Sequence, residues 1–168
     1  MRTRLKAEYV IGFDGSAHEL WRDGEVVFSG NAIEFVGRGF QGRVDRTIDY
    51  GRAVISPGLI DLDALGLERE IGSLETGKKA DVILVDLFKA HLVPLNMPVY
   101  RVTCFANGAD VSTTIVDGNV LMEDRKVQTL DEVDVMEQAQ VATDRMLART
   151  GLGRLLEAPP TLWNAAHY

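Results

Sequence analysis

Two stretches of strand-like sequence, residues 5–60 and 72–127, are joined by only eleven residues, 61–71. In both stretches, short apolar or alternating runs are separated by turn residues, which is the pattern of an antiparallel sheet. A join of this length leaves no room for a further folded domain. We therefore expect the two stretches to pack together as two small sheets. The sequence predicts one composite, mainly β domain over residues 1–168, made of an N-terminal strand set (1–60), the junction (61–71), a C-terminal strand set (72–127) and a helix with a tail (128–168).

Nine strands are predicted in these stretches. Asp23-Gly24 and Asp117-Gly118 each lie between two predicted strands, and Asp-Gly tolerates the positive φ angles of a tight hairpin turn. Residues 80–87 form the most apolar strand, which we expect inside the sheet. The predicted strands are 5–11, 18–22, 25–29, 32–37, 46–49, 53–56, 80–87, 113–116 and 119–122.

Two helices are predicted. A short one follows Pro98 and ends before Asn107-Gly108, since proline suits a first turn and Asn-Gly can end a helix. A long one spans residues 130–149, opened by Thr129 and Glu132 in capping-box spacing and closed by Gly151. Its apolar stripe should lie across the sandwich or against a partner. The stripe consists of Val133, Met136, Ala139, Val141, Thr143, Met146 and Leu147.

Composition excludes several classes of function. The chain has 168 residues, is 46% hydrophobic and carries a formal net charge of -7, so it lacks a basic field for nucleic acid or anionic membrane. No apolar run approaches the length of a membrane span. The single cysteine, Cys104, cannot form an internal disulfide, and its apolar setting predicts a buried small hydrophobe. A cytoplasmic protein fits these features.

The sequence on both sides of the junction resembles a known family. VISPGLID (54–61) and ALGLEREIGSLETGKKADVILVDL (64–87) are similar to the segments that enter and leave the catalytic barrel of the amidohydrolase superfamily, in the branch of cytosine and guanine deaminase-like and triazine chlorohydrolase-like enzymes. The resemblance covers nearly the whole chain and implies the composite β-sandwich of these metal-dependent hydrolases. It also implies that the TIM barrel, which takes roughly 250 residues, is missing.

The resemblance has a consequence for metal binding. In the family, the first barrel strand continues into a His-x-His pair that holds a divalent metal, zinc or iron, and Asp63 and Leu65 stand at those positions here. Leucine cannot ligate a metal, and the other family ligands lie on barrel strands that this chain lacks. A catalytic zinc needs at least three protein ligands. We therefore predict no catalytic, cofactor-binding or metal-binding residue in the chain.

The remaining candidate groups are interpreted as structural. The three histidines show no metal-ligand spacing: His18 is expected to be a half-exposed strand residue, His91 to cap or pack its loop, and His167 to lie in the tail. Ser56 and Ser73 are expected in turns, with no His or Lys near them in sequence to activate them. The acidic residues Asp131, Glu132 and Asp134 occupy the first turn of the long helix, where they offset its macrodipole.

These features give one leading function and one alternative. The leading hypothesis is a barrel-less scaffold or interaction domain without metal-dependent catalysis. The alternative is a fragment of a full amidohydrolase that hydrolyses C–N or C–halide bonds of a nitrogen heterocycle. Because removal of a barrel would expose apolar surface, we expect self-association through that face, or docking of the helix and the Trp163 tail over it.

Overall fold

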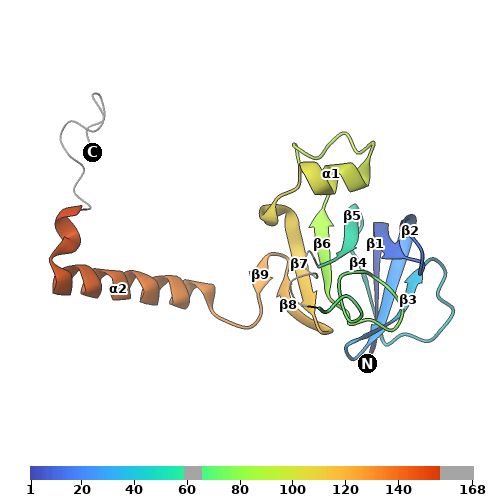
Figure 1. The fold of residues 1–168 in the computed structure, drawn as a ribbon, viewed down its shortest axis with the longest axis horizontal. Helices are drawn as coiled ribbons and strands as arrows, with labels where there is room; N and C mark the ends of the chain where they lie inside the picture. The colour runs from blue at the N-terminus through green and yellow to red at the C-terminus, as the bar shows by residue number, and fades with distance from the viewer. Residues whose placement is uncertain (59–65, 156–168) are drawn as a thin grey trace. The chain divides into compact units, whose positions relative to one another are not determined.

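The computed structural model describes residues 1–58 and 66–155 of the chain, which divide into two compact units, Met1–Thr129 and Leu130–Tyr168. The first unit contains all the strands that the described residues form (Figure 1). These strands are β1 (Arg2–Phe13), β2 (His18–Ser29), β3 (Ala32–Gly37), β4 (Arg46–Asp49), β5 (Ala53–Pro57), β6 (Val82–Asp86), β7 (Val111–Val116), β8 (Asn119–Glu123) and β9 (Lys126–Val127).

The strands form one continuous mixed sheet rather than two separate sheets. Its order is β3-β2-β1-β5-β6-β7-β8-β9, and β4 pairs with β1. This arrangement is possible because β1 is twelve residues long: one edge pairs antiparallel with β2, while the other pairs in parallel first with β4 and then with β5. The predicted mainly β fold with a C-terminal helix is confirmed, and the described residues contain no closed barrel.

The two central strands bury both of their faces. On β5, Ala53 and Ile55 belong to one apolar cluster, and Val54 belongs to another. Strand β6 divides in the same way, with Leu84 in the first cluster and Val85 in the second. Residues on alternate positions of a strand point to opposite faces of the sheet, so the sheet has a core on each side of these strands. The prediction that the apolar run 80–87 lies inside the sheet is confirmed.

The two ends of the sheet are brought together by a turn. The predicted hairpin at Asp117-Gly118 is confirmed, with φ angles of 50° and 75° between β7 and β8. Asn31 Nδ2, beside the β2–β3 turn, donates to Asp117 Oδ1 at 2.9 Å. A Cβ atom on Gly118 would collide with the carbonyl oxygen of Gly30. The hairpin tip therefore packs directly on the β2–β3 turn, and only glycine fits there.

The second predicted hairpin, at Asp23-Gly24, is wrong. Strand β2 continues through both residues, and its register with β1 runs from Arg2 opposite Ser29 to Phe13 opposite His18. Asp23 adopts a positive φ of 52° within the strand. The turn lies instead at residues 14–17. Pairing with β1 on both sides of Asp23 holds β2 continuous through a dipeptide that is locally suited to a turn.

Helix α1 (Pro98–Cys104) confirms the short helix and corrects the prediction for its cysteine. Pro98 stands in the first turn, and Phe105 is the C-cap. Asn107 caps the following 3-10 turn, Gly108–Asp110. Cys104 is exposed, not buried, because α1 buries none of its own side chains. The apolar residues beside the cysteine thus give the helix an exposed apolar surface.

In the second unit, helix α2 (Glu132–Thr150) is followed by a 3-10 turn (Leu152–Leu155). The predicted long helix and its closing residue are confirmed, since Gly151 is left-handed with φ 65°. The predicted cap Thr129 is wrong. Asp131 is the N-cap, and its side chain accepts hydrogen bonds from the backbone N–H groups of Val133 and Asp134 at 3.0 and 3.2 Å. Asp131 can cap the helix because it directly precedes the first helical residue, Glu132.

No helix within residues 1–58 and 66–155 combines the length and the apolar character that crossing a bilayer requires.

Candidate functional site

The segments on the two sides of the junction lie side by side. Strand β5, which leads toward the junction, pairs antiparallel with β6, and Pro57 stands opposite Val82. The pairing extends one residue further, where the Gly58 N–H donates to the carbonyl of Asp81 at 3.1 Å. Asp63 and Leu65 lie outside the described residues. We call residues 54–58 and 66–87 together the seam.

The part of the seam that follows the junction is packed into the β unit. Leu74 has no exposed surface and belongs to the main apolar cluster. Its carbonyl accepts from the N–H of Phe13 at 3.0 Å. Further along, the N–H of Ile33 donates to the carbonyl of Lys78 at 2.8 Å. The segment therefore forms part of the core that the N-terminal strands share.

A polar cluster within the seam was missed by sequence reasoning. Lys78 Nζ lies 2.8 Å from Ser73 Oγ, 2.7 Å from the carbonyl oxygen of Glu68 and 3.4 Å from Glu75 Oε2. The sequence shows no His or Lys next to Ser73, but the turn at Gly77 (φ 95°) returns the chain so that Lys78 lies beside the hydroxyl. A lysine that donates to these oxygens is not free to take the hydroxyl proton. The cluster ties the turn together and does not activate a nucleophile.

Ser56 lies within a strand rather than in a turn, contrary to the prediction. It belongs to β5, is 4% exposed, and its Oγ donates to the carbonyl of Pro57 at 3.1 Å. Because Ser56 is buried on a central strand and its hydroxyl contacts the neighbouring carbonyl, its role is interpreted as structural.

His91 is bound to a buried carboxylate. Its Nε2 lies 2.8 Å from Asp110 Oδ2, which also accepts from the Asn107 N–H at 2.9 Å. Asp110 is 3% exposed. Burial alone would raise the pKa of Asp110, but the hydrogen bonds from Asn107 and His91, with the charge of His91, bring that pKa below its ordinary value. The contact joins the loop after β6 to the 3-10 turn before β7.

The described residues do not fit a catalytic zinc. His18 is the first residue of β2, is exposed, and lies edge-on to the Phe13 ring at 5.2 Å between centroids. Across residues 1–58 and 66–155, no three or more His, Cys, Asp or Glu side chains gather in a way that could hold a metal ion. His167 lies beyond the described part of the chain.

One hollow of about 450 Å³ opens where the two ends of the sheet meet. Its lining includes Leu5, Phe28 and Ile115 from the core, together with Arg46 and Asp117 at the rim. No histidine or cysteine is among its lining residues. Its single carboxylate, Asp117, accepts a hydrogen bond from Asn31, and no second acid-base or metal-ligating side chain is among the lining residues.

Comparison with known proteins identifies the lineage. Residues 54–121, which span the junction, match the model of the amidohydrolase family. A 5'-deoxyadenosine deaminase of Methanobrevibacter smithii is 47% identical over 85 residues, covering 50% of this chain and 20% of that protein. A 5-methylthioadenosine/S-adenosylhomocysteine deaminase of Moorella thermoacetica is 39% identical over 129 residues, covering 76% of this chain and 29% of that protein.

A solved structure shows a weaker likeness. The adenosine deaminase from Xanthomonas campestris with bound zinc is 28% identical, with a TM-score of 0.49, over 52% of this chain and 20% of that one. The sequence matches support the amidohydrolase superfamily, of whose matched members this chain represents only a part. The relatives compared are named 5'-deoxyadenosine deaminase and 5-methylthioadenosine/S-adenosylhomocysteine deaminase, and the chain spans only about a fifth to three tenths of their length.

Proposed function

We propose that this chain is the supporting β domain of a metal-dependent deaminase that hydrolyses the C–N bond of an aminated nitrogen heterocycle, with an adenine nucleoside as the substrate class. The observation that supports this most directly is the 47% identity to a 5'-deoxyadenosine deaminase over half of the chain. On this proposal the reacting groups belong to parts of the protein outside the described residues. The C–halide chemistry considered from the sequence has no comparable support.

The chain's own contribution is to hold the two ends of a catalytic insertion together. An inserted domain usually has its ends close together, because its host must close around them. The pairing of β5 with β6 supplies such a place, since it leaves the chain on either side of the junction at one edge of the core. No catalytic step is assigned to the described residues, because they do not fit the metal.

A second candidate, a stand-alone scaffold, is favoured by the packing of the seam. Leu74, Ala80 and Leu84 are fully buried in the same cluster as Leu5 and Ile55. This cluster joins residues from both sides of the junction, so the β unit has a core of its own. The single cysteine is consistent with a cytoplasmic location, and this location is proposed for both candidate functions.

Self-association belongs to this proposal as well. Exposed large apolar side chains of the β unit gather around α1, at the upper edge of the sheet in Figure 1. Patches of this kind often mark surfaces that bind a partner. The residues are Phe88, Val93, Met97, Val99, Tyr100 and Phe105, which are 41–60% exposed.

The test of catalysis uses the purified 168-residue chain. Bound zinc and iron are measured by mass spectrometry, and ammonia release is followed with 5'-deoxyadenosine and 5'-methylthioadenosine. We expect a folded β protein with metal far below one equivalent and no ammonia above background. One equivalent of metal together with ammonia release would show that the chain itself is the enzyme.

A second measurement separates the two candidates. The intact mass of the protein in its source is determined with an antibody raised against the β unit. A mass of about 18.5 kDa supports the stand-alone scaffold. A mass several times larger supports a full deaminase that contains this domain.

A further inference from the structure

Helix α2 carries an apolar surface that the described residues leave exposed. Helix α2 buries none of its side chains. Met136, Val135 and Met146 are 63%, 50% and 42% exposed. Helices in proteins draw most of their stability from packing an apolar face against a neighbour rather than from helix propensity. An unpaired α2 would therefore lack its main source of stability.

Six of the nine apolar side chains of α2 form one stripe along the helix. Successive residues turn by about 100°, which places six apolar positions on one face. Val133 and Val141 do not belong to it, contrary to the expectation from the sequence, because they lie about 120° and 200° around the helix from Ala139. We call the face the α2 stripe: Val135, Met136, Ala139, Ala142, Met146 and Leu147.

The size of the side chains is symmetric about the middle of the α2 stripe. Ala139 and Ala142 occupy its centre, and larger side chains lie at both ends. Suppose that a second α2 runs antiparallel to the first and that the two helices cross at the height of Val141 along the axis. Val135 of one helix then meets Met146 of the other. Met136 meets Leu147 in the same way. Small residues at the crossing let the two helices approach closely, and the larger ones close the contact at each end.

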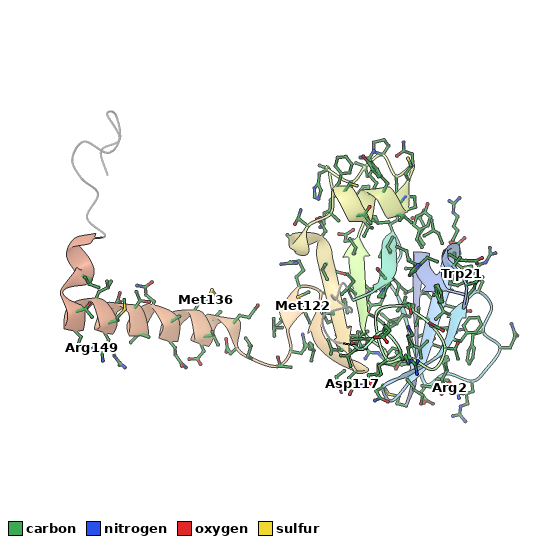
Figure 2. All side chains as sticks on the ribbon, in the orientation of Figure 1. Arg2, Trp21, Asp117, Met122, Met136 and Arg149 are labelled. Atoms are coloured by element: carbon green, nitrogen blue, oxygen red, sulfur yellow. The ribbon has the colours of Figure 1, made fainter. Side chains whose placement is uncertain are left out.

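Charge along α2 selects the antiparallel direction. Residues 131–141 contain four acidic side chains and no basic one, while residues 142–151 contain Arg145 and Arg149 against Asp144. Figure 2 shows Met136 near the beginning of the helix and Arg149 near its end. Within the described part of the chain, neither arginine forms an ion pair with a carboxylate. An antiparallel partner brings its acidic half beside these arginines, whereas a parallel one places acid beside acid.

We propose that α2 is a self-association element, which pairs antiparallel with α2 of a second copy of this chain through the α2 stripe. This goes beyond the proposed function, because it assigns a partner to the unit outside the β core and needs no catalytic part. The interface is isologous, as expected of a two-fold dimer. The arginines of each copy lie near Asp131 and Asp134 of the other.

The first experiment is sedimentation equilibrium of the full chain over a range of concentrations and salt. We expect a monomer–dimer equilibrium that weakens as salt rises, because exposed ion pairs are screened. Met146→Glu should raise the dimer dissociation constant by about tenfold or more. Val141→Glu is the matched control: it adds the same charge on the same helix, off the stripe, and should leave the constant within about twofold.

A crosslinking experiment tests direction and guards against a variant that fails to fold. Val135→Cys and Met146→Cys are made separately in a Cys104→Ser chain, and each retains its β-sheet circular dichroism if folded. Mixed under oxidation, the two variants should form a disulfide between unlike chains, while each alone should form little. Self-crosslinking of Val135→Cys with itself would overturn the antiparallel arrangement. The self-pairing would be overturned if the chain stayed monomeric at all concentrations. It would also be overturned if Met146→Glu and Val141→Glu changed the dimer dissociation constant equally.

Discussion

The β unit and helix α2 differ in where they keep their apolar side chains. Strands β5 and β6 bury apolar residues on both faces, whereas α2 buries none. The β unit therefore contains its own source of stability, from residues on both sides of the junction. The helix is secured locally by an N-cap and a C-cap, and its stripe requires a partner. Loss of a catalytic insertion would leave the first region folded and the second dependent on association.

The largest effect is expected where the seam enters the core. Leu74→Ala removes a fully buried side chain and should lower the free energy of unfolding of the β unit by about 2–5 kcal/mol. Urea unfolding followed by circular dichroism measures this change. Val133→Ala, at a side chain 60% exposed on α2, is the control and should change it by less than about 0.5 kcal/mol. A neutral Leu74→Ala would mean that the seam does not contribute to the core.

The contact between the two ends of the sheet gives the next effect. Gly118→Ala adds a methyl group against the Gly30 carbonyl at a positive φ, and should cost about 3 kcal/mol. Gly77→Ala is the matched control: its φ is also positive, but the new methyl meets nothing within 4 Å, so about 1 kcal/mol is expected. Equal losses in thermal unfolding would show that the hairpin tip does not pack on the β2–β3 turn.

A smaller, pH-dependent effect is expected at Asp110. Because its pKa is lowered in the folded chain, the stability it contributes is present above its unfolded pKa and is lost as pH falls through the folded value. Asp110→Asn should therefore cost about 1–3 kcal/mol at neutral pH, and the gap to the wild type should narrow below about pH 4. Thermal unfolding of both proteins from pH 7 to pH 3 measures the gap. A gap that is independent of pH would contradict the assigned role of the carboxylate.

Local patterns predicted most elements but not the contacts between them. The bounds of β3 and β4 were predicted correctly, since alternation bounded by turn residues defines a strand without reference to its neighbours. The hairpin predicted at Asp23-Gly24 was wrong because pairing of β2 with β1 outweighs the turn preference of this dipeptide. The predicted burial of Cys104 was wrong because an apolar sequence does not show which face of a short helix is covered.

The candidate site shows the same division. The junction could be recognised from motifs, because the segments that flank it keep their family sequence on either side. The contact of Lys78 with Ser73 and that of His91 with Asp110 could not, since each depends on how turns return the chain. Asp63 and Leu65, which stand where the family has metal ligands, lie outside the described residues, so the interpretation of those positions stays a prediction.

The smallest effect tests whether α2 depends on local capping. Asp131→Ala removes the side chain that accepts from the N–H groups of Val133 and Asp134, and should cost the helix about 1 kcal/mol. Amide exchange of these two groups should then accelerate about fivefold, because 1.4 kcal/mol corresponds to tenfold. Thr129→Ala, at the cap expected from the sequence, should leave both rates unchanged. If the two variants act alike, capping does not set where α2 begins, and packing of its stripe against a partner must hold the first turn instead.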